Sequence, residues 1–337
     1  MTDMLAARLH VPTNELRMER VPVPEPGPGQ VRIAVRAAGV CLSDVHLLDG
    51  TLRPAWLKGD TVTLGHEVAG VIDALGAGVD AWTAGQRVLL QAGELDLRGV
   101  VLTRGVDYDG GYAEYALASA TTVVPIPDGL PFEQACVIPD AVSTPWAAVT
   151  TTADTRPGDA AAVWGAGGLG AHAVQLLRLV GAAPVIAIDP LPAARERALT
   201  LGADAVLDPA DPKLRDTVMD LTDGFGLDVA LDLAGVPAVR EQALTVLGPA
   251  GRLVVVGLAG QPIAIPNDIG LAYFRQSVRG HYGSAPQDVQ RLVTLAGRGR
   301  LDLSASVSDL LPLAEAPAAL DRLARKEGDP VRLVLVP

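Results

Sequence analysis

The chain has 337 residues, of which 49% are hydrophobic and 20% are charged. This length exceeds one hydrophobic core of typical size, so we expect two domains, and the composition excludes a disordered chain. The 27 basic and 39 acidic residues give a formal net charge of −12, which disfavours nucleic acid and membrane surfaces as partners. Two cysteines make no disulfide framework and no signal peptide is visible, so we predict a cytoplasmic protein.

The first part of the chain predicts a mostly antiparallel β domain. Residues 1–20 alternate weakly, as in a hairpin, and residues 31–36 alternate clearly, as in a strand. Residues 37–50 predict a strand that passes into a helix. Further strands are predicted at 62–73 and 86–91, with glycine turns between them.

From about residue 153 the pattern changes to strands that alternate with helices. The predicted strands are 160–164, 184–188, 205–207, 227–233 and 252–256, and the predicted helices are 169–180, 193–201, 213–221 and 236–247. This alternation is typical of βαβ units on a parallel sheet, so the fold class is α/β. The last stretch, 286–337, predicts two helices and a terminal strand.

A glycine-rich stretch follows the first strand of this second region. It matches G-x-G-x-x-G, a helix opens at it, and the next strand ends in Asp189. Such glycines allow a tight turn and close approach of a pyrophosphate to the helix N-terminus. A βαβ turn with incidental glycines is the alternative, but the strand–loop–helix context favours a dinucleotide site. The predicted cofactor loop consists of Gly165, Gly167, Gly168, Leu169 and Gly170.

Asp189 predicts which dinucleotide is bound. Its carboxylate would accept hydrogen bonds from both adenosine ribose hydroxyls and would repel a 2′-phosphate. No arginine follows it within five residues. The sequence therefore favours NAD over NADP.

Four residues are candidate metal ligands: Cys41, His66, Glu67 and Asp140. Thiolate, imidazole and carboxylate together suit zinc, and three protein ligands with one open position form the catalytic arrangement. Each of these residues could instead have a purely structural role. Cys41 could be a small buried residue, His66 and Glu67 a core histidine with a paired glutamate, and Asp140 a helix cap.

Three stretches resemble the zinc-dependent alcohol dehydrogenases of the medium-chain dehydrogenase/reductase superfamily. They are GVCLSDVHLLDG at 39–50, LGHEVAGVI at 64–72, and the glycine loop with its Asp189. Their order and spacing agree with that family over essentially the whole chain. The resemblance implies a GroES-like, mostly β catalytic domain that is split around a Rossmann domain.

The resemblance also implies domain boundaries and a zinc count. The catalytic domain would comprise residues 1–145 and 285–337, and the NAD-binding domain residues 146–284. Residues 91–111 contain no cysteine, whereas family members with a structural zinc carry four closely spaced cysteines there. We therefore expect one catalytic zinc ion per subunit and no structural zinc.

By motif position, the resemblance assigns roles to individual residues. Cys41, His66 and Asp140 would be zinc ligands, and Glu67 would be a further ligand in one state or a neighbouring catalytic carboxylate. Asp44 would orient His66. The remaining assignments are a proton relay of Ser43 and His46, and cofactor contacts from Thr144 beside the nicotinamide, Val256, and Arg332 near the pyrophosphate.

The predicted reaction is hydride transfer between an alcohol and NAD, which reversibly gives a ketone or aldehyde. We expect a secondary or cyclic alcohol, although the sequence leaves primary alcohols open. The alternatives are a zinc-free quinone or enoyl reductase of the same superfamily and a non-catalytic dinucleotide-binding structural protein. We also expect a homodimer or homotetramer whose partner is a small-molecule alcohol or carbonyl compound.

Overall fold

The computed structural model describes residues 2–337, which form two compact units. Contacts group Met1–Ala141 with Ala285–Pro337 in the first unit and Val142–Ser284 in the second. Whether the folding domains divide at residues 145 and 284 stays a prediction. Over the described residues, no helix combines the length and the apolar character needed to cross a membrane.

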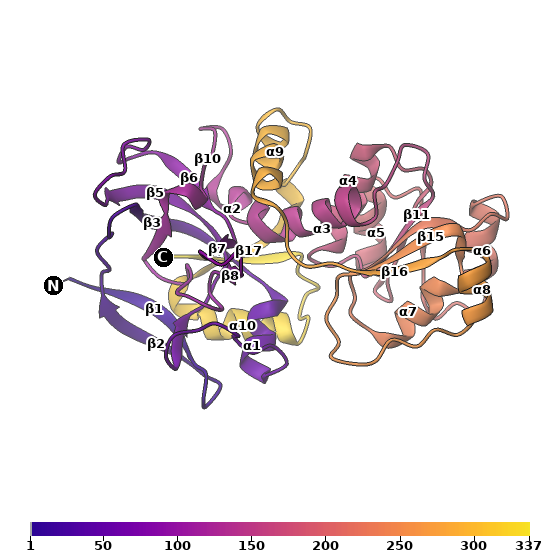
Figure 1. The fold of residues 1–337 in the computed structure, drawn as a ribbon, viewed down its shortest axis with the longest axis horizontal. Helices are drawn as coiled ribbons and strands as arrows, with labels where there is room; N and C mark the ends of the chain where they lie inside the picture. The colour runs from indigo at the N-terminus through magenta and orange to yellow at the C-terminus, as the bar shows by residue number, and fades with distance from the viewer. Residues whose placement is uncertain (1) are drawn as a thin grey trace. The chain divides into compact units, whose positions relative to one another are not determined.

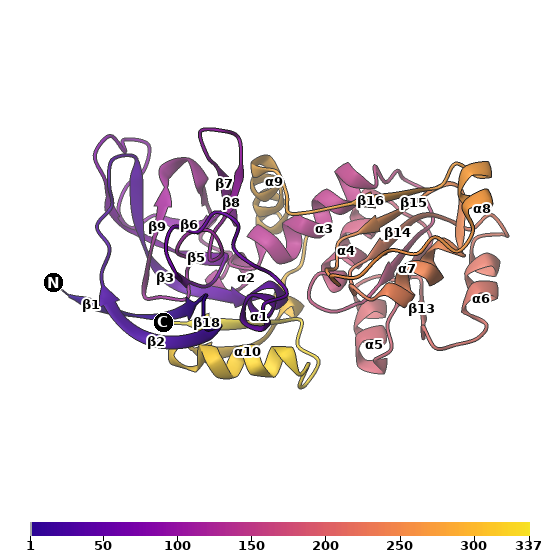
Figure 2. The ribbon, with the colours of Figure 1, turned by 60° about the horizontal axis from the view of Figure 1, so that its bottom comes forward.

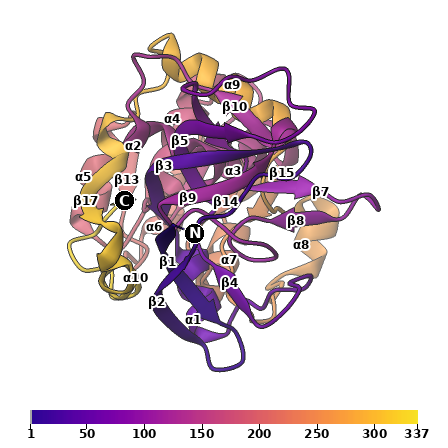
Figure 3. The same ribbon diagram turned by 90° about the vertical axis from the view of Figure 1, so that its left-hand side faces the viewer.

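The first unit is built on β-sheets whose strands come from distant parts of the chain (Figure 1). Its smaller sheet has the order β2-β1-β4 and confirms the predicted N-terminal hairpin. Its larger sheet has the order β10-β6-β5-β3-β18-β17, with β9 also paired to β3, and Figure 3 shows β3 between β5 and β9. Only β17 and β18 pair in parallel within these sheets over the described residues.

The strands of these sheets are β1 (Asp3–His10), β2 (Glu15–Pro22), β3 (Gln30–Val40), β4 (Thr61–Thr63), β5 (Glu67–Leu75), β6 (Arg87–Leu90), β9 (Tyr115–Ser119), β10 (Val123–Pro125), β17 (Val307–Pro312) and β18 (Arg332–Val336). A separate hairpin is formed by β7 (Gly93–Leu95) and β8 (Val101–Thr103). Strand β3 joins the predicted strand over 31–36 to the strand part of 37–50, because its alternating first half continues into the buried residues Ala37–Val40. The predicted terminal strand is β18, whereas β17 was not predicted.

Four α-helices and three 3₁₀ turns also belong to the described part of the first unit. They are α1 (Leu42–Asp49), α2 (Phe132–Ala135), α9 (Pro286–Gly297) and α10 (Ala316–Ala324), with 3₁₀ turns at Ala120–Thr122, Ser304–Ser306 and Leu313–Glu315. Helix α1 lies beside α10 (Figure 2). The predicted strand-to-helix transition is confirmed, since β3 ends one residue before Cys41 and α1 begins one residue after it.

The prediction of one continuous strand over residues 62–73 is wrong. Strand β4 ends at Thr63 and β5 begins at Glu67, so the chain leaves the sheet between them. Gly65 has a φ of +96°, a conformation that favours glycine. A Cβ at this position would also lie 2.3 Å from the ring of Tyr112. The alternating hydrophobic pattern continues through this break, which therefore left no sign in the periodicity.

The second unit contains the predicted parallel sheet. Its strand order is β13-β12-β11-β14-β15-β16, which is the order of a Rossmann sheet. The strands are β11 (Ala161–Trp164), β12 (Val185–Ile188), β13 (Ala205–Leu207), β14 (Leu227–Asp232), β15 (Leu247–Val255) and β16 (Ser277–Gly280). The edge strand β16 was not predicted, because its sequence SVRG is short and carries no alternating apolar pattern.

Helices cover both faces of this sheet. They are α3 (Ser143–Ala147), α4 (Gly170–Val180), α5 (Pro192–Thr200), α6 (Leu214–Leu221), α7 (Pro237–Leu244) and α8 (Asp268–Tyr273). Along β11, Ala161 and Val163 pack with α4 and α5, while Ala162 and Trp164 pack with α6 and α7. Figure 1 shows α4 and α7 on opposite sides of the sheet. The sheet is therefore buried on both faces, as parallel sheets require.

Two leucines on α4 test this packing. Leu177 is fully buried and Leu179 is 37% exposed. The Leu177→Ala variant should lose about 2–5 kcal/mol of unfolding free energy, because it leaves a cavity under the sheet. The matched variant Leu179→Ala should lose less than about 1 kcal/mol. Urea unfolding monitored by circular dichroism measures both, and equal losses would contradict the assigned faces of the helix.

Candidate metal centre and dinucleotide loop

The break between β4 and β5 brings two polar side chains to the end of a buried strand. His66 lies in the break and Glu67 is the first residue of β5. Strand β5 pairs with β3, where Gly39 stands opposite Glu67, so Cys41 at the start of α1 lies close by. Asp140 comes from a π-helical turn, Ile138–Val142, a feature frequent at functional sites.

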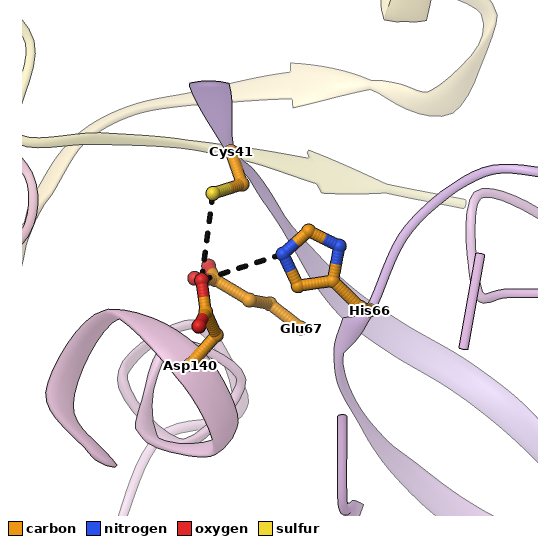
Figure 4. A group of neighbouring side chains, drawn as sticks. All are labelled: Cys41, His66, Glu67 and Asp140. Carbon is orange, nitrogen blue, oxygen red and sulfur yellow. Dashed lines mark hydrogen bonds and ion pairs between the residues drawn. The ribbon is translucent and has the colours of Figure 1, made fainter. Parts of the chain in front are cut away.

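The four predicted metal ligands converge in the structure (Figure 4). One potential ligand atom from each of them lies within 4.8 Å of the others. Oδ2 of Asp140 lies 3.4 Å from Sγ of Cys41 and 3.4 Å from Nε2 of His66. Cys41, His66 and Glu67 are buried, and Asp140 is partly exposed. The arrangement thus combines one sulfur, one nitrogen and two carboxylate donors at the edge of the protein interior.

This donor set fits a zinc ion. Zinc bonds to sulfur, nitrogen and oxygen of about 2.0–2.3 Å in tetrahedral geometry separate the donors by roughly 3.3–3.7 Å. The two separations of 3.4 Å measured from Asp140 Oδ2 fall in this range. In addition, Oε2 of Glu67 is buried without a hydrogen-bond partner among the described residues, which is costly unless a cation offsets it. Cys41, His66, Asp140 and Glu67 could therefore hold zinc.

Glu67 is held in place from several sides. Its Oε1 accepts a hydrogen bond of 3.0 Å from the backbone N–H of Ala141 and lies 2.9 Å from Nη2 of Arg332. A Cβ on Gly39 would lie 2.0 Å from Oε2 of Glu67. Only glycine at position 39 therefore leaves room for this carboxylate, a requirement that sequence reasoning missed.

Arg332 lies against Glu67, and its predicted contact with a cofactor pyrophosphate stays a prediction. It is only 3% exposed, its Nη2 contacts Glu67, and its Nη1 donates a hydrogen bond of 3.4 Å to the carbonyl of Val40. The guanidinium thus offers little surface to a phosphate group. Its evident partner is the buried carboxylate, since a buried charge needs an opposite charge nearby.

The cluster perturbs its own ionisable groups. Burial lowers the pKa of His66, but the charge of Asp44 and hydrogen bonds with Asp140 and Cys41 outweigh burial and hold that pKa well above its usual value. Burial raises the pKa of Glu67 to about 7, because it outweighs the attraction of Arg332. Both shifts show that the site attracts positive charge, whether a proton or a metal cation.

Asp44 connects His66 to a second layer of contacts. Its carboxylate is fully buried, and Oδ1 lies 3.7 Å from Nδ1 of His66. Its Oδ2 accepts hydrogen bonds from the backbone N–H of Cys41 at 3.1 Å and from the hydroxyl of Tyr112 at 2.7 Å. Sequence reasoning missed Tyr112, because no local motif links it to a residue 68 positions away.

The predicted proton relay lies on α1. The hydroxyl oxygen of Ser43 is 3.7 Å from Sγ of Cys41, so it is close to the metal ligands. His46 is one turn further along, with a side chain 20% exposed and Nδ1 3.6 Å from Asp49. One residue is thus near the ligand cluster and the other reaches solvent. The relay itself stays a prediction.

The predicted cofactor loop lies between β11 and α4. Gly165 has a φ of +89°, and a Cβ on Gly170 would lie 1.7 Å from the carbonyl oxygen of Gly165. Both positions therefore require glycine. A Cβ on Gly167 would meet nothing within 4 Å, so this part of the loop is open. Gly168 and Leu169 lie between this open position and the first residue of α4.

Asp189 follows β12 and is tied to that loop. Its Oδ2 accepts a hydrogen bond of 2.8 Å from the N–H of Ala166, and its Oδ1 accepts one of 2.8 Å from the N–H of Leu191. Two arginines also lie here: Arg195 donates to the backbone oxygen of Asp189 at 2.6 Å, and Arg197 to that of Ala166 at 3.0 Å. Both arginines lie beyond the five residues after Asp189 in which the sequence contains no arginine.

Two further predicted cofactor residues belong to the second unit. Thr144 is buried on α3, and its carbonyl oxygen accepts a hydrogen bond of 3.0 Å from Nε2 of His281. Val256 directly follows β15 and is buried. Their contacts with a nicotinamide cofactor stay predictions.

A Rossmann unit with a glycine loop, together with a cysteine–histidine–carboxylate cluster on a β unit, is the arrangement expected of a metal-binding, nucleotide-dependent dehydrogenase. Comparison with known families agrees. Residues 27–128 match the alcohol dehydrogenase GroES-like domain, and residues 168–298 match the zinc-binding dehydrogenase domain. The chain is 31% identical to an alcohol dehydrogenase of Cupriavidus necator, with 100% of both chains covered.

Solved structures agree with these matches. The alcohol dehydrogenase of Aeropyrum pernix superposes with a TM-score of 0.89 at 33% identity and covers 99% of this chain and 100% of its own. A zinc-binding dehydrogenase of Sinorhizobium meliloti, solved with NADP, gives a TM-score of 0.91 at 25% identity with 100% of both chains covered. The chain belongs to the zinc-dependent alcohol dehydrogenase family of the medium-chain dehydrogenase/reductase superfamily.

The raised pKa of Glu67 predicts how stability depends on pH in protein freed of metal ions. The folded state binds the Glu67 proton with a pKa of about 7, whereas the model value is 4.5. Between these values the folded state carries more protons than the unfolded state, so stability should fall as pH rises, by at most about 3 kcal/mol from this group. Denaturant unfolding from pH 4.5 to 7.5 measures the slope.

The matched control for this measurement is Glu67→Gln, which cannot ionise. His66 contributes in the same direction as the pH rises through its raised pKa, and it is present in both proteins. The difference between the two slopes therefore reports Glu67. Identical slopes would show that Glu67 ionises at its ordinary pKa.

Proposed function

We propose that the chain is a zinc- and NAD-dependent alcohol dehydrogenase that oxidises a secondary or cyclic alcohol reversibly to a ketone. The observation that carries this proposal is the convergence of Cys41, His66, Glu67 and Asp140 within 4.8 Å, on a chain of this family. Neither a zinc-free quinone or enoyl reductase nor a non-catalytic binding protein requires such a set of metal ligands. Neither alternative is favoured.

The residues divide the work of alcohol oxidation. When bound, zinc supplies Lewis-acid polarisation of the substrate oxygen, which eases loss of the hydroxyl proton. Cys41, His66 and Asp140 would hold the ion, and Asp44 would fix the His66 imidazole with Nε2 directed at it. Ser43 would accept the hydroxyl proton, and the partly exposed His46 would return it to solvent. Glu67 would serve as an additional ligand, because its Oε2 has no other partner among the described residues.

The second unit would hold the hydride acceptor. The open glycine loop and the N-terminus of α4 would bind the pyrophosphate, and Asp189 would bind the adenosine ribose. NAD is favoured because the Asp189 carboxylate is fixed beside the loop by two backbone N–H groups. A 2′-phosphate would meet that negative charge. Thr144 and Val256 would contact the nicotinamide end.

Cytoplasmic location and assembly into a homodimer or homotetramer remain predictions. Helix α8 exposes Ile269 and Tyr273 to 77% and 80%, and β16 is an edge strand of the described sheet. Exposed apolar groups beside an open sheet edge favour a protein–protein contact. One zinc ion per subunit is also proposed, since the described residues offer one such ligand cluster.

Cysteine substitutions test the metal centre. Cys41→Ser should lose bound zinc and lower kcat for alcohol oxidation by more than about a hundredfold, because a ligand is lost. The affinity for NAD should stay within about twofold, because the glycine loop is untouched. The control is Cys136→Ser, a second buried cysteine whose Sγ contacts the backbone oxygen of Glu133; it should keep zinc and activity. Elemental analysis and steady-state kinetics measure both, and full activity in Cys41→Ser would refute the site.

Asp189 tests the cofactor preference. Asp189→Ser removes the proposed ribose acceptor, so the affinity for NAD should fall by roughly tenfold to a hundredfold, while the affinity for NADP should rise. Asp208→Ser is the control. Asp208 follows the neighbouring strand β13, and its carboxylate lies 3.1 Å from Arg195. Fluorescence titration with NADH and NADPH measures both affinities. Tighter binding of NADPH than of NADH by the unmodified protein would overturn the preference.

A further inference from the structure

The hydroxyl of Tyr112 contacts the carboxylate behind the metal-binding histidine. Tyr112 is fully buried, and its hydroxyl lies 2.7 Å from Oδ2 of Asp44 and 2.9 Å from the carbonyl oxygen of Gly39. A tyrosine hydroxyl has one proton to donate, and a carboxylate is the stronger acceptor. The hydroxyl therefore donates its proton to Asp44. It also lies next to the carbonyl oxygen of Gly39, in the strand that leads to Cys41.

This donor answers a physical need of Asp44. A fully buried carboxylate is costly unless its oxygens are satisfied. On Oδ2 the structure places two donors, the N–H of Cys41 at 3.1 Å and the hydroxyl of Tyr112. Among the described residues, Oδ1 has no hydrogen-bond donor, and this oxygen lies 3.7 Å from Nδ1 of His66. Because two hydrogen bonds hold Oδ2 of Asp44, its Oδ1 is available to orient the imidazole of His66.

The ring of Tyr112 is positioned as firmly as its hydroxyl. Its Cδ1 and Cε1 occupy the space that a side chain at Gly65 would fill, at 2.3 and 2.6 Å from an ideal Cβ. The backbone N–H of Tyr112 donates a hydrogen bond of 2.9 Å to the carbonyl oxygen of Leu64. The break that carries His66 is thus packed against the same tyrosine whose hydroxyl holds Asp44.

We propose that Tyr112 is a positioning residue of the metal centre: its hydroxyl holds Asp44, and Asp44 orients His66 toward the ion. This inference rests on the proposed zinc site. It assigns Tyr112 no contact with substrate or cofactor. Its function is to keep the imidazole of His66 in the orientation that a zinc ligand requires, with Nδ1 toward Asp44 and Nε2 toward Asp140.

The test compares two tyrosine variants. Tyr112→Phe keeps the ring that packs on Gly65 and removes only the hydroxyl. Tyr108→Phe is the matched control, because the Tyr108 hydroxyl is also buried but has no hydrogen-bond partner in the described chain. The zinc-loaded protein is mixed with excess EDTA and zinc release is followed. Tyr112→Phe should release zinc roughly tenfold faster than the wild type, and Tyr108→Phe at the wild-type rate.

A second readout separates positioning from general loosening of the fold. In protein labelled with ¹⁵N-histidine, the Nδ1 resonance of His66 should shift in Tyr112→Phe and stay unchanged in Tyr108→Phe. In an Asp44→Asn background, removal of the Tyr112 hydroxyl should change the release rate by less than about threefold, because the charge that it stabilises is gone.

The outcomes are distinguishable. Wild-type protein that cannot be loaded with zinc would overturn the proposed function and this inference together. Wild-type protein that binds zinc, with Tyr112→Phe releasing it at the same rate, would overturn only the role of Tyr112. Equal acceleration in both tyrosine variants, or an undiminished effect in the Asp44→Asn background, would show that the hydroxyl acts through the fold and not through Asp44.

Discussion

The structure of the first unit depends on the burial of several charges beside one another. Glu67 and Asp44 are fully buried, His66 and Cys41 nearly so, and one cation, Arg332, lies among them. Such a group would repel itself without compensation. The compensation comes from backbone N–H groups, a tyrosine hydroxyl and a guanidinium, and the remaining negative charge would favour binding of the proposed divalent cation. The same excess of buried negative charge would destabilise the metal-free site and would attract the proposed metal ion.

Much of the architecture could be predicted from the sequence, because it rests on local signals. The alternation of strands and helices after residue 153 predicted the parallel sheet, and the glycine pattern predicted the loop between β11 and α4. The four ligand candidates were found from residue type and motif position, and the structure brings them together. In each instance a short stretch of sequence carries its own physical requirement, such as a positive φ at Gly165.

The remainder depends on contacts between distant positions, which no local pattern encodes. The contact of Arg332 with Glu67 was not predicted, because only the pairing of β18 with β3 determines what is next to this arginine. Tyr112 and Gly39 were missed because no local motif links the Tyr112 hydroxyl to Asp44, or the space at Gly39 to Glu67. The break at Gly65 was not predicted, because the alternating pattern of apolar residues continues through it.

The placement of Arg332 also has a consequence for biosynthesis. Residues 41–140 supply all the candidate zinc ligands, but the only guanidinium against Glu67 among the described residues is added 265 positions after that glutamate. At about 5–20 residues per second, the ribosome needs on the order of tens of seconds to make the intervening chain. During that interval the entire Rossmann unit emerges, while the β unit lacks both strand β18 and its counter-charge. All four candidate ligands of the proposed metal centre are therefore synthesised well before Arg332, the residue that contacts Glu67.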